Sequence, residues 1–293
     1  MLREESLKRK YDKTIEQHYQ KVAEDCGLSS TSTMADEITR QYETEAILQF
    51  VSASLRTLQT ESPKRKATIM DIGCGNGYSL NKIIERYPEQ RFVGIEKSDD
   101  LRALASSRFE GNDNVIILEG DIRDPHFAEA DSVDILICQR VLINLLDLED
   151  QRCALNNIVE VVISPATSQS GGTLLFIEAF SSFLAKLNKA RAEFDLSPIP
   201  PAHHNLYLPD DFFDTPRLRP FLTDDFLIPP NFLSTHYFVT RVLYPIFNKN
   251  KPLKRNTEFV RFFSAALKEN VGDYSPLRLH IFKKETKHTT QRS

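Results

Sequence analysis

Asp71-Ile72-Gly73-Cys74-Gly75-Asn76-Gly77 directly follows a short apolar run, residues 67–70. Glycines at alternate positions allow a strand to turn sharply into a helix, and they let a ligand approach the backbone where a Cβ would obstruct it. A dinucleotide site places its third glycine one residue later, in the pattern G-x-G-x-x-G. Because residue 78 is Tyr, the spacing favours a nucleoside cofactor of another kind.

These seven residues match motif I of the Rossmann-like (class I) S-adenosylmethionine-dependent methyltransferases, D-x-G-x-G-x-G, at every position. The chain therefore resembles this family, in particular its branch that modifies small molecules and glycans. The resemblance implies S-adenosyl-L-methionine as the cofactor. It also implies that the loop contacts the cofactor through Asp71, Gly73, Cys74, Gly75, Asn76 and Gly77.

Strand and helix patterns alternate five times between residues 67 and 180. Apolar runs and helical spacing predict strands at 67–72, 91–96, 114–118, 133–138 and 173–179, with helices at 78–87 and 148–162. The alternation predicts an α/β fold, a doubly wound and mostly parallel seven-stranded sheet with helices on both faces. In such a sheet the resemblance implies a terminal antiparallel pair, which we expect at 234–243 and 277–282, with a helix at 258–267 between them.

Polar residues after later strands complete the predicted cofactor site. Glu96 ends the second strand about 20 residues after the last glycine, where related folds place the carboxylate that accepts from both ribose hydroxyls. The resemblance places Asp121 against the adenine amino group and Ile122 against the purine face. Lys97 is included among the cofactor-binding residues because it follows Glu96, although we expect its side chain to be solvated. Gln139 begins the segment that faces the sulfonium in this family.

The segment after the fourth strand also narrows the acceptor. Methyltransferases that act on flipped bases carry [DNS]-P-P-[YFW] there, whereas residues 139–145 read Gln-Arg-Val-Leu-Ile-Asn-Leu. The formal charge of −4 is spread without basic blocks, so the footprint that nucleic-acid binding needs is missing. We therefore expect a small-molecule or saccharide acceptor, no nucleic acid partner, and either a monomer or a homodimer.

Two helices are predicted before the core, and we assign residues 1–62 to an N-terminal helical lid. Apolar residues repeat at helical spacing from residue 7 to residue 22, and Gly27 is placed to end that helix. Thr33 is the predicted cap of the second helix. In similar methyltransferases such helices fold over the cofactor, which would place Tyr11, Tyr19 and Met34 near it.

The remaining residues, 63–284, are expected to form the catalytic domain, with a substrate-capping insertion after strand five at 180–232 and a flexible tail at 285–293. The insertion is rich in proline, aspartate and aromatic residues and is long enough to cover the site. Its hydrogen-bonding side chains are the predicted substrate ligands, namely Asn188, Arg191, Asn205 and Tyr207.

The chemistry of the acceptor stays open between a hydroxyl and an amine. A hydroxyl acceptor benefits from a general base, and the candidates are His203, His204 and Glu178. An amine acceptor needs only to arrive unprotonated. We expect no metal site, because side chains at adjacent positions diverge and no carboxylate or cysteine stands at a ligand spacing from the two histidines.

Cysteine usage and hydropathy indicate the compartment. Cys26, Cys74, Cys138 and Cys153 form no C-x-x-C pair, which predicts reduced thiols. No apolar run is long enough for a signal peptide or a membrane span, so a cytoplasmic protein is expected. Two alternatives remain beside the small-molecule enzyme: a catalytically silent cofactor-binding subunit that regulates a partner, and an enzyme with a peptide or protein acceptor.

Overall fold

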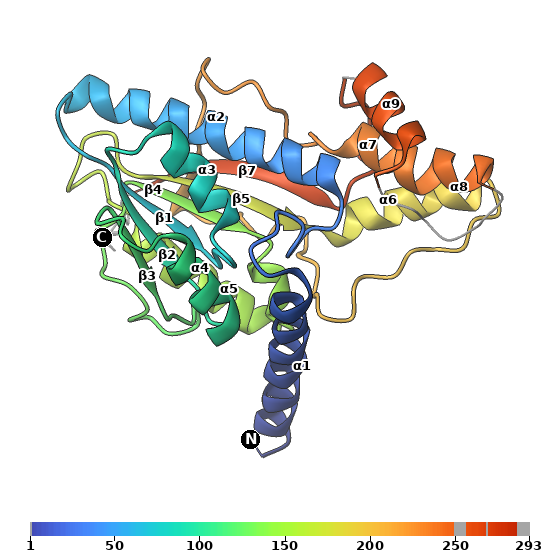
Figure 1. Cartoon of the computed structure of the whole chain (residues 1–293), viewed down its shortest axis with the longest axis horizontal. Helices are drawn as coiled ribbons and strands as arrows, with labels where there is room; N and C mark the ends of the chain where they lie inside the picture. The colour runs from blue at the N-terminus through green and yellow to red at the C-terminus, as the bar shows by residue number, and fades with distance from the viewer. Residues whose placement is uncertain (1, 249–255, 268, 286–293) are drawn as a thin grey trace, which may run out of the picture.

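A seven-stranded sheet of order β3-β2-β1-β4-β5-β7-β6 forms the centre of the protein in the computed structural model, which describes residues 2–248, 256–267 and 269–285 (Figure 1). Its strands are β1 (Thr68–Ile72), β2 (Arg91–Ile95), β3 (Val115–Leu118), β4 (Ile135–Gln139), β5 (Thr173–Ala179), β6 (Leu218–Pro220) and β7 (Leu277–Lys284). Strands β1 to β5 pair in parallel, and β7 runs antiparallel to both β5 and β6. The predicted α/β class and sheet are confirmed.

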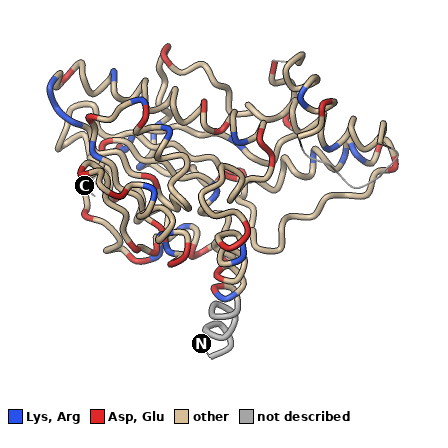
Figure 2. Tube along the Cα trace, viewed as in Figure 1, with Lys and Arg blue, Asp and Glu red and all other residues tan. Residues whose placement is uncertain are grey.

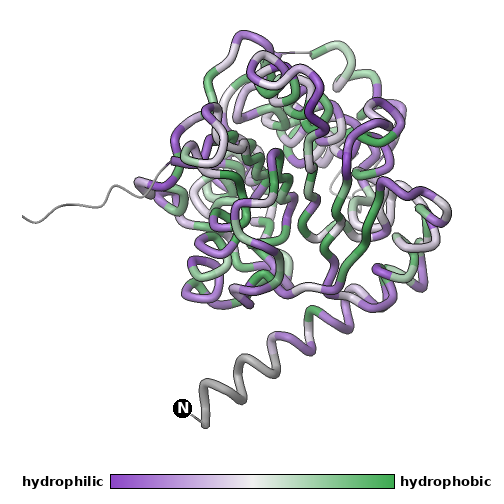
Figure 3. The backbone as a smooth tube through the Cα atoms, turned by 90° about the vertical axis from the view of Figure 1, so that its left-hand side faces the viewer, coloured by the Kyte–Doolittle hydropathy of each residue, from purple (hydrophilic) through white to green (hydrophobic). Residues whose placement is uncertain are grey.

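The central strands are buried on both faces, as the long apolar runs predicted. All seven residues of β5 are buried, and Figure 3 shows hydrophobic residues along the middle of the sheet. Ile72 pairs with both Ile95 and Cys138. The residues that follow these strands therefore lie together at the carboxyl edge of the sheet, which is where the site is built.

Helices cover both faces of the sheet (Figure 1). Helix α2 (Glu37–Glu61) and helix α3 (Tyr78–Arg86) pack against each other on one face, and α2 also contacts β4 and β5. Helix α4 (Asp99–Arg108) packs on β3, and α5 (Leu148–Val161) contacts the short 3₁₀ helix η1 (Leu142–Asn144). The apolar stripe of α2 explains its long contact with the sheet, because it buries residues such as Phe50, Val51 and Leu55.

Helix α1 (Leu2–Cys26) projects away from the sheet (Figures 1 and 3). Gly27 ends it as predicted, in the left-handed region with φ of +50°, and its N–H bonds to the carbonyl of Ala23 at 3.0 Å. The cap of α2 is Asp36, whose carboxylate accepts from the N–H of Thr39. The prediction of Thr33 as that cap is wrong, because Thr33 lies in the connecting segment over the glycine loop.

The strand predicted at 234–243 is wrong. These residues form α7 (Ser234–Phe238) and a short π-helix, η2 (Val239–Leu243), which continues into α8 (Tyr244–Phe247). Aromatic and β-branched residues favoured a strand, but the buried positions follow helical spacing, because the segment packs between α6 (Ser181–Ala192) and α9 (Glu258–Ala266). Tertiary packing overrode the local preference.

The sixth strand, β6, instead lies within the residues predicted as an insertion, 180–232. Helices α6 to α9 form a separate group beside the end of β5 (Figure 1), whereas β6 pairs with the last residues of β7. Helix α6 and the π-helix η2 share a second hydrophobic cluster, formed by Leu184, Leu187, Ala190 and Val242. The predicted tail lies outside the described residues except for Glu285, whose N–H bonds to the carbonyl of Arg217. In the described part of the chain, no helix combines the length and the apolar character that a membrane span requires.

Candidate cofactor site and its lid

The glycine loop adopts the backbone that its sequence requires. Gly73, Gly75 and Gly77 have φ of +63°, +57° and +77°, a region that residues with a Cβ rarely enter. A Cβ on Gly73 would lie 2.5 Å from Val141, and one on Gly77 would lie 2.6 Å from the ring of Phe109. Two of the glycines are therefore fixed by packing as well as by conformation.

Glu96 is joined directly to this loop. Its two carboxylate oxygens accept from the N–H of Gly75 and the N–H of Ser98, each at 2.8 Å. Burial raises the pKa of Glu96, although these backbone donors oppose the shift. Each oxygen keeps a further lone pair, so a carboxylate held in this way can still accept from ribose hydroxyls.

A buried group of four charges lies beside the loop, with Asp71 on β1, Arg40 and Glu43 on α2, and Arg140 after β4. Arg140 Nε is 3.4 Å from a carboxylate oxygen of Glu43, whose side chain is fully buried. Burial and the nearby charge of Glu96 raise the pKa of Asp71 to about 7. Burial and the charge of Arg140 lower the pKa of Arg40 to about 10. Two guanidinium groups and two carboxyl groups thus lie together here.

Three members of this group, Arg40, Asp71 and Arg140, line a small cavity of about 30 Å³. Its walls are Thr33, Arg40, Asp71, Gly73, Cys74, Gly75, Asn76, Tyr78, Ser79, Gln139 and Arg140. Ligand pockets for molecules of cofactor size usually enclose about 300–1,000 Å³. The segment over the loop must therefore move outward to admit a molecule of that size.

The covering segment is the connection between α1 and α2, residues 27–36, which we call the lid segment. Asn76 Nδ2 donates to the carbonyls of Gly27 and Ser29 at 2.8 and 3.0 Å. Arg140 Nη1 donates to the carbonyl of Thr33 at 2.9 Å. The lid segment is consequently held by the glycine loop and by the residue after β4, the two elements that it covers.

Two features at this edge, an unpaired buried donor and a strained backbone, are typical of a ligand site. Gln139 Nε2 is buried without an acceptor among the described residues, while its Oε1 accepts from Ser79 at 3.3 Å. Arg140 has φ of +56°, a strained conformation for a residue with a side chain. A buried donor beside a cradle that only glycine can form fits a polar ligand.

Asp121 and Lys97 take part in an ion cluster that joins α1 to the sheet. Charged residues of both signs gather where α1 meets the domain (Figure 2). Arg123 donates to both oxygens of Asp121, and its Nη1 lies 3.0 Å from Asp12 of α1. Lys97 is exposed to solvent, as expected, and its Nζ is 3.1 Å from Asp121. Ile122 is buried beside the cluster, and the adenine contacts of Asp121 and Ile122 remain predictions.

Glu178 does not have the geometry of a general base. It is fully buried, and its carboxylate accepts from the backbone N–H groups of Val141, Leu142 and Ile143 at 2.9 to 3.2 Å. Burial raises its pKa to about 7, against the effect of these donors. Glu178 therefore holds the segment after β4 in position, which corrects the prediction.

Asn188 and Arg191 stabilise the group of helices α6 to α9, which we call the cap. Asn188 exchanges two hydrogen bonds with the backbone of Ile199, at 2.8 and 2.9 Å, and Arg191 donates to the carbonyls of Ser197 and Arg241. These partners occupy both side chains, so the predicted substrate role is wrong for them. Burial raises the pKa of Tyr207 to about 12, and Tyr207 packs between the two hydrophobic clusters.

A polar bridge connects α1, the segment after β4 and the loop after α6. Asn144 Nδ2 donates to the hydroxyl of Tyr19 at 2.6 Å, and Asn205 Nδ2 donates to Asn144 Oδ1 at 2.8 Å. Tyr11 borders a cavity of about 10 Å³ between α1 and the segment after β4, and Met34 packs on the main core from the lid segment. Of the predicted lid residues, Tyr19 thus has a direct link to the segment that borders the cofactor cavity.

His203 and His204 immediately precede Asn205 in the same loop and lie against His18 of α1. Burial, together with the nearby histidines, lowers the pKa of His204 to about 4. Such a ring is a weak general base near neutral pH. The exposed His203 keeps its place as the candidate base.

Sequence reasoning missed Thr33, Arg40, Glu43 and Arg140. Arg40 and Glu43 stand three residues apart within the apolar stripe of α2, and two charges on a buried helical face were an available signal. Arg140 directly follows the predicted Gln139. Thr33 carried no comparable signal, because its place over Gly75 depends on how the lid segment folds back.

Comparison with known proteins supports the prediction of a methyltransferase domain in the part of the chain that holds the glycine loop. A family model described as a methyltransferase domain matches residues 69–164. Trans-aconitate 2-methyltransferase of Acidovorax sp. (strain JS42) is 38% identical over 56 residues, 19% of this chain and 20% of that protein. Methyltransferase ungE' of Aspergillus campestris is 32% identical over 76 residues, 24% of this chain and 22% of that protein. The chain thus spans about a fifth of the length of these relatives.

Among solved structures, the YcgJ protein of Bacillus subtilis is similar with a TM-score of 0.42 and 15% identity, over 80% of this chain and 97% of that one. This similarity is too low to add to the topology. The seven-stranded sheet and the glycine-loop motif are stronger evidence for the fold and its cofactor loop, because both are properties of this chain. Residues 69–164 therefore match a methyltransferase-domain family, and they contain the glycine loop.

Proposed function

We propose that the protein transfers a methyl group from S-adenosyl-L-methionine to a hydroxyl or amino group of a small molecule or saccharide. The observation that supports this most is the glycine loop with positive φ at all three glycines, closed against the buried carboxylate of Glu96. A dinucleotide site is not favoured, since Tyr78 stands where the third glycine of that motif would be.

The residues of the site would divide the binding task between them. Glu96 would accept from the ribose hydroxyls, and the buried Gln139 Nε2 would donate to a polar group at the inner end of the cavity. Arg40 and Arg140 line the same cavity and suit the carboxylate of an amino acid moiety. Asp71, opposite in charge, suits its amino group.

When bound, the cofactor supplies a methyl group on a sulfonium, and the acceptor lone pair displaces the sulfur, which keeps the electrons of the broken bond. The protein needs mainly to align the two reactants about 3–3.5 Å apart and to exclude water. The lid segment would exclude water, because it lies on the glycine loop. A hydroxyl acceptor would lose its proton to His203 or to solvent.

The experiment is calorimetric titration with S-adenosylmethionine and, separately, with NAD. We expect micromolar binding of S-adenosylmethionine alone. Gly75→Arg should abolish it, because the new side chain meets the lid segment 3.7 Å beyond the Cβ position. Glu96→Ala should weaken it about 10-fold or more through the loss of charge-assisted hydrogen bonds, whereas Ala at the exposed Glu110 should leave it unchanged.

Binding of NAD in place of S-adenosylmethionine, or equal affinity in wild type and Gly75→Arg, would overturn the proposal. Acceptor pools of alcohols, amines, sugars and peptides, read by mass spectrometry for methylated products, then separate the remaining possibilities. Tight cofactor binding with no product from any pool would favour the silent regulatory subunit. A product only from peptides would favour the protein acceptor.

A further inference from the structure

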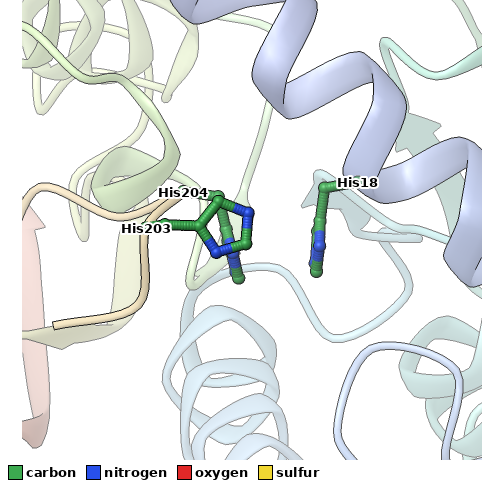
Figure 4. A group of neighbouring side chains, drawn as sticks. All are labelled: His18, His203 and His204. Carbon is green, nitrogen blue, oxygen red and sulfur yellow. The ribbon is translucent and has the colours of Figure 1, made fainter. Parts of the chain in front are cut away.

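Three histidine rings from distant parts of the chain meet at one place (Figure 4). His18 comes from α1, and His203 and His204 come from the loop after α6. One nitrogen of each ring can be chosen so that all three lie within 4.8 Å of one another. The rings of His18 and His204 stack with centroids 3.7 Å apart, and His203 stands at 83° to His204.

The cluster has unused capacity to bind a ligand. Nδ1 of His204 is buried and has no hydrogen-bond partner among the described residues. His18 and His204 are half-buried, and a neutral imidazole ring keeps an in-plane lone pair on one of its two nitrogens. His203 is exposed, which leaves the cluster open to solvent on one side.

We propose that His18, His203 and His204 bind a divalent transition-metal ion such as Zn²⁺, with water in the fourth position. Three neutral imidazoles with an open position are a donor set that Zn²⁺ and neighbouring metals accept. Two nitrogens on a tetrahedral zinc lie about 3.3 Å apart, given Zn–N bonds of about 2.0 Å. The separation of up to 4.8 Å therefore has to shorten by about 1.5 Å at most.

Metal binding requires one ring to leave the stack. The lone pairs of an imidazole lie in the plane of the ring, and the planes of His18 and His204 are only 19° apart, so the two cannot point at one ion as they stand. A rotation of the partly exposed His18 about its side-chain bonds brings its nitrogen toward the other two. The bound site and the stacked arrangement are thus two states of the same three residues, and His203 can act as a general base only in the metal-free state.

The site would fasten α1 to the loop after α6. In the structure α1 is held to the segment after β4 by the hydrogen bond from Asn144 to Tyr19, and nearer its N-terminus by the ion pair of Asp12 with Arg123. The lid segment follows α1 directly and contacts the glycine loop through Asn76. An ion that binds only when α1 is docked stabilises the docked state by mass action.

The test uses protein without a polyhistidine tag, treated with chelator and titrated with Co²⁺, whose visible absorption reports tetrahedral coordination. We expect one Co²⁺ per chain, displaced by Zn²⁺. His18→Ala and His203→Ala should each weaken Co²⁺ binding by about 30-fold or more, because each removes a ligand. His126→Ala, at an exposed histidine elsewhere, should bind Co²⁺ as the wild type does.

Hydrogen exchange separates the metal site from a general effect on folding. Zn²⁺ should slow exchange of amides in residues 11–26 in the wild type and in His126→Ala but not in His18→Ala. The proposal is overturned if the wild type binds no Co²⁺ at micromolar concentrations, or if His18→Ala binds it with wild-type affinity. Unchanged exchange in α1 on saturation with Zn²⁺ would refute the fastening of α1.

Discussion

The edge of the sheet around the glycine loop and the cap formed by α6 to α9 both bury polar side chains, but they use them differently. At the glycine loop, both carboxylate oxygens of Glu43 and Nε2 of Gln139 lack hydrogen-bond partners among the described residues. In the cap, Asn188 and Arg191 are bonded to backbone carbonyls on neighbouring loops. Buried polar groups without hydrogen-bond partners indicate a region that can bind a ligand. Buried polar groups whose hydrogen bonds are all made indicate a structural role.

Where the lid segment meets the cap, the buried polar side chains are hydrogen-bonded to one another. His236 bonds through Nε2 to the carboxylate of Asp36 at 3.0 Å and through Nδ1 to Ser264 at 2.9 Å, and all three side chains are buried. Burial alone would raise the pKa of Asp36, but its hydrogen bond to His236 and nearby positive charge outweigh burial and lower the pKa. This network ties the start of α2 to α7 and α9.

The largest expected effect is at Glu43. Glu43→Ala leaves the half-buried Arg140 without its ionic partner, which should lower the free energy of unfolding by about 3 kcal/mol. Urea denaturation measures this effect. Glu45→Ala, two residues away on the exposed face of α2, should change stability by about 0.5 kcal/mol or less. Similar losses at both positions would show that the buried charges do not act as a balanced group.

Next is the pH dependence of stability from Glu178. Its folded pKa of about 7 exceeds the ordinary value of 4.5, so the folded chain holds more protons than the unfolded chain between these values. Stability should therefore fall as pH rises from about 4.5 to about 7, by up to about 3 kcal/mol from this group. Asp71 should contribute a decrease of the same sign.

Glu178→Gln tests this directly, because an amide does not titrate. Denaturation at a series of pH values should show a smaller decrease in the variant, and Gln at the exposed Glu110 should retain the wild-type profile. A profile for Glu178→Gln that parallels the wild type would mean that Glu178 is ionised throughout. The three backbone donors would then outweigh burial.

A smaller effect is expected at the glycine loop. Gly77 and Gly111 have nearly equal φ, +77° and +79°, but a Cβ on Gly77 meets Phe109 at 2.6 Å while one on Gly111 meets nothing within 4 Å. Both changes to Ala should cost about 1 kcal/mol in backbone strain, and Gly77→Ala about 1–2 kcal/mol more through overpacking. Calorimetry should show weaker S-adenosylmethionine binding only for Gly77→Ala.

The smallest effect is expected in the cap. Asn188→Ala removes two hydrogen bonds to Ile199 and should lower the free energy of unfolding by about 1–2 kcal/mol, with the affinity for S-adenosylmethionine unchanged. Lys189→Ala, at the exposed neighbouring position, should leave both quantities unchanged. A clear loss of cofactor affinity in Asn188→Ala would contradict the assignment of a purely structural role to Asn188.

Local sequence predicted the sheet well, because its signals are local. The run at 173–179 gave the bounds of β5 correctly, and the approach to Gly73 gave β1 within a residue. The segment 234–243 failed because its residues favour a strand while its partners, α6 and α9, select a helix. Those partners are far away in sequence, so no local pattern could have revealed them.

The sequence by itself determined the glycine loop and the carboxylate of Glu96, because positive φ and a fixed spacing between strand ends are encoded within a few residues. Only the tertiary structure decided which polar side chains face a cavity and which join two loops. Asn188 and Arg140 are both polar, yet one pins the cap and the other lines the site. The contact of His18 with His204 was likewise decided by the tertiary structure, because it requires α1 to lie against the loop after α6.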